Sequence, residues 1–222
     1  MPSLRSSLRV GLHRALLRDA IGSALAHFTS LERGLDLGCG EGPYHELFAT
    51  VCRSVIAYDI RRHVGVGVVG AAAALPFRSA TFDLVLSTQV LEHVADPAMA
   101  VKEIARVLVP CGAVILTVPQ MVALHEAPHD YFRYTEFGIR HLLTKYGFKG
   151  IVVRPLGGFW TMLAQQLEFR LLWDHAPRSR MFRQVQLVLG RLLVAGLAAI
   201  DGSRPEGRYA LNHLASGYLG RS

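Results

Sequence analysis

Short hydrophobic runs alternate with amphipathic stretches from residue 34 to residue 155 of the chain. This alternation is typical of a parallel β-sheet whose strands are joined by helices that cover both faces. We therefore expect an α/β fold over this region. The runs expected to form strands read GLDLG, SVIAYDI, VGVGVV, FDLVLS, AVILTVP and IVVRPL.

Two helices in this region carry recognisable start and stop signals. Asp96 and Pro97 suit the N-cap and the first helical position, and apolar residues recur after them at helical spacing. A second helix is expected from about Phe137 to Tyr146, with Gly147 as its stop signal. Both helices would connect neighbouring strands of the sheet.

The two ends of the chain differ from the alternating region. Residues 1–30 keep a helical apolar stripe up to the first strand, which favours a docked helix over a secretory signal or a transit peptide. Residues 158–203 contain long apolar helical stretches, and a run at 207–215 within residues 204–222 predicts a last strand. We expect one domain, with a core at residues 31–157 and a helical insertion before the last strand.

Composition and charge narrow the class of protein. With 222 residues of which 51% are hydrophobic, the chain can bury one sizeable core, which excludes a disordered chain or a disulfide scaffold. Its three cysteines show no paired spacing, so we identify no metal site and expect a reducing, cytoplasmic location. The net charge of +7 comes from scattered arginines, which weakens a nucleic-acid-binding interpretation.

A glycine-rich loop carries the strongest chemical signal. Residues 35–42, LDLGCGEG, place glycines at alternate positions directly after an apolar strand, which brings backbone amides close to a ligand. The next strand ends at Asp59, and an acidic residue at the carboxyl edge of a sheet can bind ribose hydroxyls. The two features predict a nucleoside ligand. The G-x-G-x-G spacing differs from the G-x-G-x-x-G of dinucleotide-binding proteins.

Three further segments follow in order: LPF at 75–77, FDLVLSTQVLEHV at 82–94 and RVLVPCGAVILTVP at 106–119. Together with the loop, they resemble the class I S-adenosylmethionine-dependent methyltransferases, most closely the type 11 branch, over residues 34–119. The resemblance implies a Rossmann-like fold with a seven-stranded, mostly parallel sheet. It also implies S-adenosylmethionine as the cofactor.

The resemblance places the cofactor against the loop and the neighbouring strand ends. The methionine end would lie on the loop and the ribose on Asp59, while Gln89 after the fourth strand would face the cofactor. The residues expected to bind the cofactor are Asp36, Gly38, Cys39, Gly40, Asp59, Ile60, Ala74, Leu75 and Gln89.

Two positions depart from the family pattern. Residues 71–74 are all alanine where the family often has an acidic residue that accepts from the adenine amine. The adenine would therefore rely on Leu75, on backbone groups and on Ile60. Cys111 stands where the family usually has the first glycine of a Pro-Gly-Gly turn, and we expect this change to be tolerated.

Three histidines are candidates for the base that a hydroxyl or protonated amine acceptor requires, because histidine changes charge near neutral pH. His93 follows the fourth strand, where a structural hydrogen bond in the turn is the slightly favoured alternative. His125 and His129 lie in the segment HEAPHDYFRYT, residues 125–135. The resemblance implies that this segment covers the cofactor pocket and contributes to the acceptor site.

The same segment supplies the candidate substrate-binding residues Tyr131, Arg133 and Tyr134. The alternative is an ordered loop in which Arg133 pairs with Asp130 and the aromatic residues fill the core. Three arrangements are open for the insertion: a hydrophobic lid, packing within the domain or across a homodimer, and peripheral contact with anionic lipid. Its longest apolar run, residues 185–200, is shorter than a membrane span requires.

We expect methyl transfer to oxygen or nitrogen of a small acceptor, of a kind that includes hydrophobic and lipid-linked molecules. Residues 87–90, STQV, lack the Asn/Asp-Pro-Pro-aromatic motif of amide and exocyclic-amine methyltransferases. None of the cysteines is placed for methylation of pyrimidine carbon. The alternatives are an RNA methyltransferase and a non-catalytic protein of the same fold that binds the cofactor or a partner.

Overall fold

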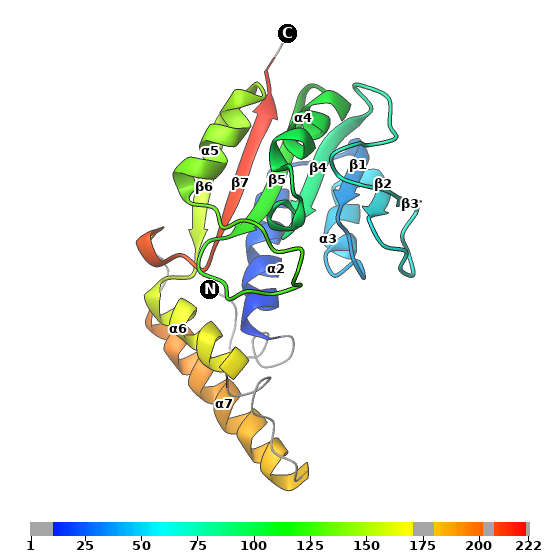
Figure 1. Cartoon of the computed structure of the whole chain (residues 1–222). Helices are drawn as coiled ribbons and strands as arrows, with labels where there is room; N and C mark the ends of the chain where they lie inside the picture. The colour runs from blue at the N-terminus through cyan, green and yellow to red at the C-terminus, as the bar shows by residue number, and fades with distance from the viewer. Residues whose placement is uncertain (1–10, 171–179, 202–206, 221–222) are drawn as a thin grey trace. The chain divides into compact units, whose positions relative to one another are not determined.

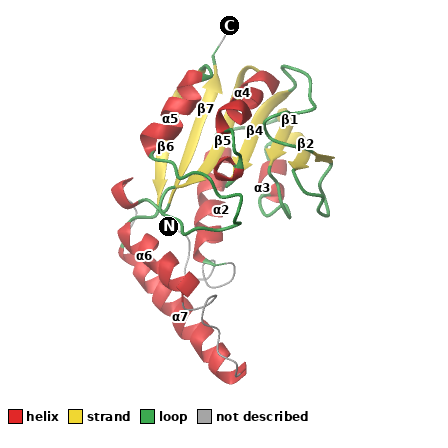
Figure 2. Ribbon diagram, in the orientation of Figure 1, coloured by secondary structure: helices red, strands yellow, loops and turns green. Residues whose placement is uncertain are grey.

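The computed structural model describes residues 11–170, 180–201 and 207–220. The strands form one seven-stranded sheet in the order β3-β2-β1-β4-β5-β7-β6, and β1, β2, β3, β4 and β5 pair in parallel (Figures 1 and 2). The predicted Rossmann-like sheet is thereby confirmed. The strands are β1 (Leu31–Leu37), β2 (Cys52–Asp59), β3 (Val68–Val69), β4 (Phe82–Thr88), β5 (Leu108–Pro119), β6 (Phe148–Leu156) and β7 (Asn212–Leu219).

Helices flank the sheet, with α4 and α5 in front of it in Figure 2. The α-helices are α2 (Leu12–Leu25), α3 (His45–Ala49), α4 (Pro97–Val107), α5 (Glu136–Lys145), α6 (Phe159–Glu168) and α7 (Arg180–Ile200). Two short 3-10 turns, η1 (Leu91–His93) and η3 (Gly207–Tyr209), complete the described elements.

The two helices predicted from their end signals form where expected. The Asp96 side chain accepts a hydrogen bond from the Met99 N–H, 3.0 Å away, and caps α4, while Pro97 occupies its first turn. Helix α5 ends at Lys145, just before Gly147. Val101 and Ile104 on the buried face of α4 belong to the main hydrophobic core, together with strand residues Leu35, Val85 and Leu116.

Two strand boundaries differ from the predicted ones. The run VGVGVV forms only the two residues of β3, and Val64 within it is fully exposed. The last strand was predicted at 207–215 but spans 212–219, because residues 207–209 form η3. The strand continues through Ser216 and Gly217, which carry no hydrophobic side chain by which the sequence pattern could extend it.

By its contacts, the chain divides into two compact units, and the predicted single domain stays a prediction. The larger comprises residues 21–119, 124–154 and 213–222, and the smaller comprises residues 1–20, 120–123 and 155–212. Residues 1–10, 171–179, 202–206 and 221–222, which belong to the predicted N-terminal helix, insertion and tail, lie outside the described residues.

The predicted insertion before the last strand contains α6 and α7. Within the smaller unit, Leu12, Ala164 and Ala198 are buried together. The Asp201 carboxylate accepts from the backbone N–H groups of Gly158 and Thr161 at 2.9 and 2.7 Å, and so joins the end of α7 to the start of α6. None of the described helices is both long enough and apolar enough to cross a membrane.

Candidate active site

The carboxyl ends of four parallel strands are aligned across the sheet. Tyr58 of β2 pairs with Leu37 of β1, which pairs with Ser87 of β4, which in turn pairs with Leu116 of β5. The segments that follow these strands therefore meet at one edge, where open α/β sheets bind their ligands. All the residues predicted to bind the cofactor or the acceptor belong to the larger unit.

The glycine-rich loop is hydrogen-bonded to the end of β2. The backbone N–H groups of Gly38 and Cys39 donate to the Tyr58 carbonyl at 2.7 and 3.1 Å. Gly38 has a φ of +75°, and a Cβ added there would lie 2.2 Å from Cγ2 of Val90, so no larger residue fits. At Gly40 an added Cβ would meet no atom within 4 Å, so the loop faces open space. Burial raises the pKa of the Cys39 thiol to about 11.

Asp59 ties the loop to the end of β2. Its Oδ2 accepts from the Gly40 N–H at 2.8 Å and its Oδ1 from the Arg61 N–H at 2.9 Å. Because each carboxylate oxygen has a second lone pair, these bonds leave acceptor capacity for a ligand hydroxyl. Asp36 is also buried, and burial together with the charge of Asp59 raises its pKa from 3.8 to about 7.

The end of β4 carries polar groups that lack partners. Gln89 has a φ of +54°, a conformation that is uncommon outside glycine and is found at functional sites. Its Nε2 donates to Oγ1 of Thr117 at 3.2 Å, but its buried Oε1 has no hydrogen-bond partner in the structure, nor has Oγ of Ser87. Unsatisfied buried polar atoms require an explanation, and a ligand at this edge supplies one.

The residues predicted to lie near adenine occupy different environments. Ile60 directly follows Asp59 and is 69% exposed. Leu75 is 5% exposed and packs in the main core, while its N–H donates to Oε2 of Glu103 at 2.8 Å. Ala74 closes a short turn by donating to the Ala71 carbonyl. Ile60 is therefore better placed for ligand contact than the Leu75 side chain, while the Leu75 carbonyl also accepts from Arg106 and leaves its backbone engaged.

The predicted covering segment is bonded to η1. The Tyr131 N–H donates to the Glu92 carbonyl at 2.8 Å, and the Tyr134 hydroxyl donates to the Leu91 carbonyl at 3.0 Å. On the other side, the guanidinium of Arg61 pairs with Glu126 at 3.2 Å. The segment thus connects the turn after β4 with the residues that follow Asp59.

The three candidate histidines gather in this region. Nδ1 of His93 lies 2.6 Å from the His129 carbonyl, and because a carbonyl can only accept, Nδ1 donates and Nε2 is the basic nitrogen of the neutral ring. The His93 and His125 rings meet edge to face with centroids 4.9 Å apart. Nδ1 of His129 lies 2.9 Å from the Tyr131 hydroxyl.

The candidate substrate-binding residues divide between surface and interior. Tyr131 is 46% exposed beside the histidines. The two guanidinium nitrogens of Arg133 lie 2.6 and 2.7 Å from the two Asp130 oxygens, which is the pairing considered as the alternative. That pairing, led by the hydrogen bonds from Arg133, holds the pKa of Asp130 far below its usual range. Tyr134 is buried in the core.

Residues 35–116 match the sequence profile of the type 11 family described as "Methyltransferase domain". The matched segment contains the glycine-rich loop, Asp59, and the end of β4. Over this segment, the chain belongs to the class I S-adenosylmethionine-dependent methyltransferases. The predicted family is confirmed.

Individual members show how far the similarity reaches. A "Probable S-adenosylmethionine-dependent methyltransferase" of Mycolicibacterium smegmatis is 31% identical over 147 residues, which are 59% of this chain and 57% of that protein. A ubiquinone biosynthesis O-methyltransferase of Cereibacter sphaeroides is 28% identical over 183 residues, which are 66% of this chain and 74% of that protein. The alignment thus spans little more than half the length of the first relative.

A solved structure extends the similarity to the fold of the whole chain. Phosphoethanolamine N-methyltransferase 2 of Haemonchus contortus, in complex with S-adenosyl-L-methionine, gives a TM-score of 0.60 at 18% identity. The comparison covers 100% of this chain and 61% of that one. At this identity the likeness establishes the class I methyltransferase fold.

Sequence reasoning did not single out one buried acid that lies beside the candidate histidines. Glu92 lies next to His93 in η1, is 0% exposed, and neither of its carboxylate oxygens has a hydrogen-bond partner in the structure. Burial is the main cause that raises its pKa to about 8. A charged residue inside the apolar run VLEHV was the signal that could have found it.

Proposed function

We propose that this protein transfers the methyl group of S-adenosylmethionine to an oxygen or nitrogen atom of a small acceptor. The observation that carries the proposal is the glycine-rich loop, open at Gly40 and tied to Asp59, at the edge where the strand ends of the sheet meet. Asp36, Gly38, Cys39, Gly40 and Asp59 are the residues we assign to the methionine and ribose ends of the cofactor.

The chemistry of these residues fits this cofactor. The raised pKa of Asp36 means that a ligand with positive charge would stabilise its ionised form, and S-adenosylmethionine carries an amino group and a sulfonium. The Asp59 carboxylate suits two neighbouring hydroxyls. When bound, S-adenosylmethionine supplies an electrophilic methyl carbon, to which the acceptor lone pair bonds as the carbon–sulfur bond breaks with its electrons left on sulfur.

On the acceptor side, the chain's own residues orient the acceptor and remove its proton. We assign proton removal to the histidine group, and place His93 first because its Nδ1 is anchored to the His129 carbonyl and its Nε2 is basic. His125 is positioned by Asp130, and His129 by Tyr131. Holding the acceptor in line and excluding water supplies the rest of the rate enhancement.

A hydrophobic acceptor suits the surface beside these histidines. The side chains of Leu124, Tyr131 and Phe132 are exposed. All three lie within a few residues of His125 or His129 in the sequence. Acceptors of this kind also agree with the name of the Cereibacter relative, a ubiquinone biosynthesis O-methyltransferase. We propose Tyr131 as an acceptor contact, whereas Arg133 and Tyr134 would shape the site through Asp130 and the core.

The insertion offers a second hydrophobic surface. Val188, Leu189, Leu192 and Leu193 of α7 are exposed. A hydrophobic acceptor, packing within the domain, a second copy of the chain or a lipid surface would each cover such side chains. A cytoplasmic location stays a prediction.

The proposal is tested by incubating the protein with S-adenosylmethionine and a panel of hydroxylated aromatic and lipid-like acceptors, and measuring S-adenosylhomocysteine by mass spectrometry. We expect acceptor-dependent product and a loss of about 100-fold in kcat for His93→Ala. The matched control is His141→Ala, an exposed histidine on α5, which should keep the wild-type rate. Product formation that never exceeds the acceptor-free rate, in protein that binds S-adenosylmethionine, would contradict it.

A further inference from the structure

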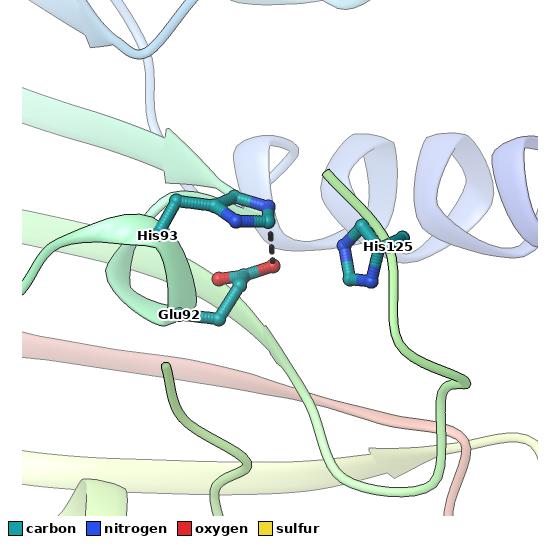
Figure 3. Close-up of side chains that lie close together, drawn as sticks. All are labelled: Glu92, His93 and His125. Atoms are coloured by element: carbon teal, nitrogen blue, oxygen red, sulfur yellow. Dashed lines mark ion pairs between the residues drawn. The ribbon is translucent and has the colours of Figure 1, made fainter. Parts of the chain in front are cut away.

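Glu92, His93 and His125 form a cluster of metal-ligating side chains at the carboxyl edge of the sheet. One candidate ligand atom from each lies within 4.8 Å of the other two. Figure 3 shows a Glu92 carboxylate oxygen directed toward the space between the two imidazole rings. Glu92 and His93 belong to η1, whereas His125 follows β5 and reaches them because its segment is bonded to η1.

The carboxylate of Glu92 is the feature that most requires a partner. It is 0% exposed, and both oxygens lack a hydrogen-bond partner in the structure. A buried carboxyl group without any partner is unfavourable, and native structures contain few of them. A bound cation would satisfy both oxygens at once. The carboxylate lies 3.9 Å from Nε2 of His93, too far for a hydrogen bond to do so.

The second nitrogen of each histidine is engaged as in metal sites. Nδ1 of His93 donates to the His129 carbonyl at 2.6 Å, which directs the basic Nε2 toward Glu92. Nδ1 of His125 lies 3.4 Å from Oδ2 of Asp130, and the His125 N–H also donates to that oxygen at 2.9 Å. Backbone carbonyls and carboxylates are the usual partners that orient metal-binding histidines.

We propose that Glu92, His93 and His125 bind one divalent transition-metal cation, with zinc as the best match. Two imidazoles and one carboxylate are a recurrent zinc ligand set, and three protein ligands leave a coordination position open. Zinc–ligand distances of about 2.0–2.2 Å place ligand atoms about 3.5 Å apart, so the side chains would close by about 1 Å on binding. The sequence spacing does not reveal these three ligands, because His125 is distant in sequence and reaches Glu92 and His93 only in the folded chain.

The inference rests on the proposed methyl transfer and narrows its acceptor. A cation bound to Glu92 and the two histidines would bind an acceptor oxygen and stabilise its ionised form. The favoured acceptor is then a hydroxyl compound and not an amine. His93 serves as a ligand in the metal-bound protein, and the cation replaces it as the group that promotes loss of the hydroxyl proton.

The test is a calorimetric titration of chelator-treated, tag-free protein with zinc chloride, followed by a titration with cobalt chloride read by visible absorption. We expect one equivalent of zinc to bind, and Co²⁺ to give the absorption of a low-symmetry site. Glu92→Gln, which keeps the side-chain volume, and His93→Ala should each weaken binding by about 100-fold, and Asp130→Asn by about tenfold. His141→Ala is the matched control and should bind as the wild type does.

Two results would overturn the inference: no saturable zinc binding by the folded wild-type protein, or one-equivalent binding that persists unchanged in Glu92→Gln and His93→Ala. Circular dichroism of each variant establishes that it is folded. A parallel titration with S-adenosylmethionine separates this inference from the proposed function. Retained cofactor binding without zinc binding removes the metal site alone, whereas zinc binding without cofactor binding removes the methyltransferase proposal and the acceptor role of the metal.

Discussion

Asp36 makes the stability of the cofactor-free protein depend on pH. Burial is the larger cause and Asp59 the smaller one of a pKa of about 7, against an ordinary value of 3.8. Between these two pH values the folded protein keeps a proton that the unfolded chain has lost. Stability therefore falls as pH rises from about 4 to about 7 and is then constant. The replacement Asp36→Asn removes this dependence.

The size of the effect follows from the pKa difference. Each pH unit corresponds to about 1.4 kcal/mol, so about three units give up to about 4 kcal/mol. Asp36→Asn should therefore be more stable than the wild type at pH 8 by up to about 4 kcal/mol, and the two should converge near pH 4. Urea unfolding at both pH values measures the difference.

Cofactor binding should reverse the effect. A positively charged ligand favours ionised Asp36, so binding at pH 7 should release about half a proton from this group. Calorimetry in two buffers of different ionisation enthalpy measures the release, and Asp36→Asn reports the proton exchange of the ligand itself. Equal proton release by both proteins, together with equal stability at pH 8, would refute the reasoning.

Three further predictions concern local geometry. Gly38→Ala should destabilise the protein by about 2 kcal/mol or more, because its Cβ would collide with the turn after β4. Gly40→Ala should cost only about 1 kcal/mol of stability but weaken S-adenosylmethionine binding by about 100-fold. Thermal unfolding measures the stability of each variant, and calorimetry measures its cofactor binding. Cys111 is exposed with a φ of +64°, so Cys111→Gly should raise stability by about 0.5–1 kcal/mol, and a loss in urea unfolding would contradict this. Arg133→Ala leaves the buried Asp130 carboxylate without its main partner and should cost about 3 kcal/mol, and a loss below about 1 kcal/mol would show that the pair is unimportant.

The position of the candidate cofactor-binding residues at the strand ends was predictable because its signal is local. The loop begins at the end of β1, Asp59 is the last residue of β2, and parallel strands bring their carboxyl ends to one edge whatever surrounds them. The predicted N-cap at Asp96 was confirmed for the same reason, since capping depends on four consecutive residues.

The acceptor half depends on contacts between distant segments and was therefore harder to predict. The apolar run VLEHV is the one local sign that Glu92 is buried, and its full environment is created only when the segment from His125 to Tyr134 bonds to η1. The role of Arg133 was ambiguous for the same reason: only the fold shows that its guanidinium is committed to Asp130.

The most direct test of the cofactor site is a calorimetric titration with S-adenosylmethionine of the wild type, Asp59→Ala and Asp83→Ala. Asp83 is a matched control because it also accepts two backbone N–H groups, from Glu32 and Arg33, but at the opposite end of β4. We predict one binding site, a loss of about 30-fold or more for Asp59→Ala from two lost hydrogen bonds, and a change within about twofold for Asp83→Ala. No binding by the wild type, or equal losses in the two variants, would contradict the account.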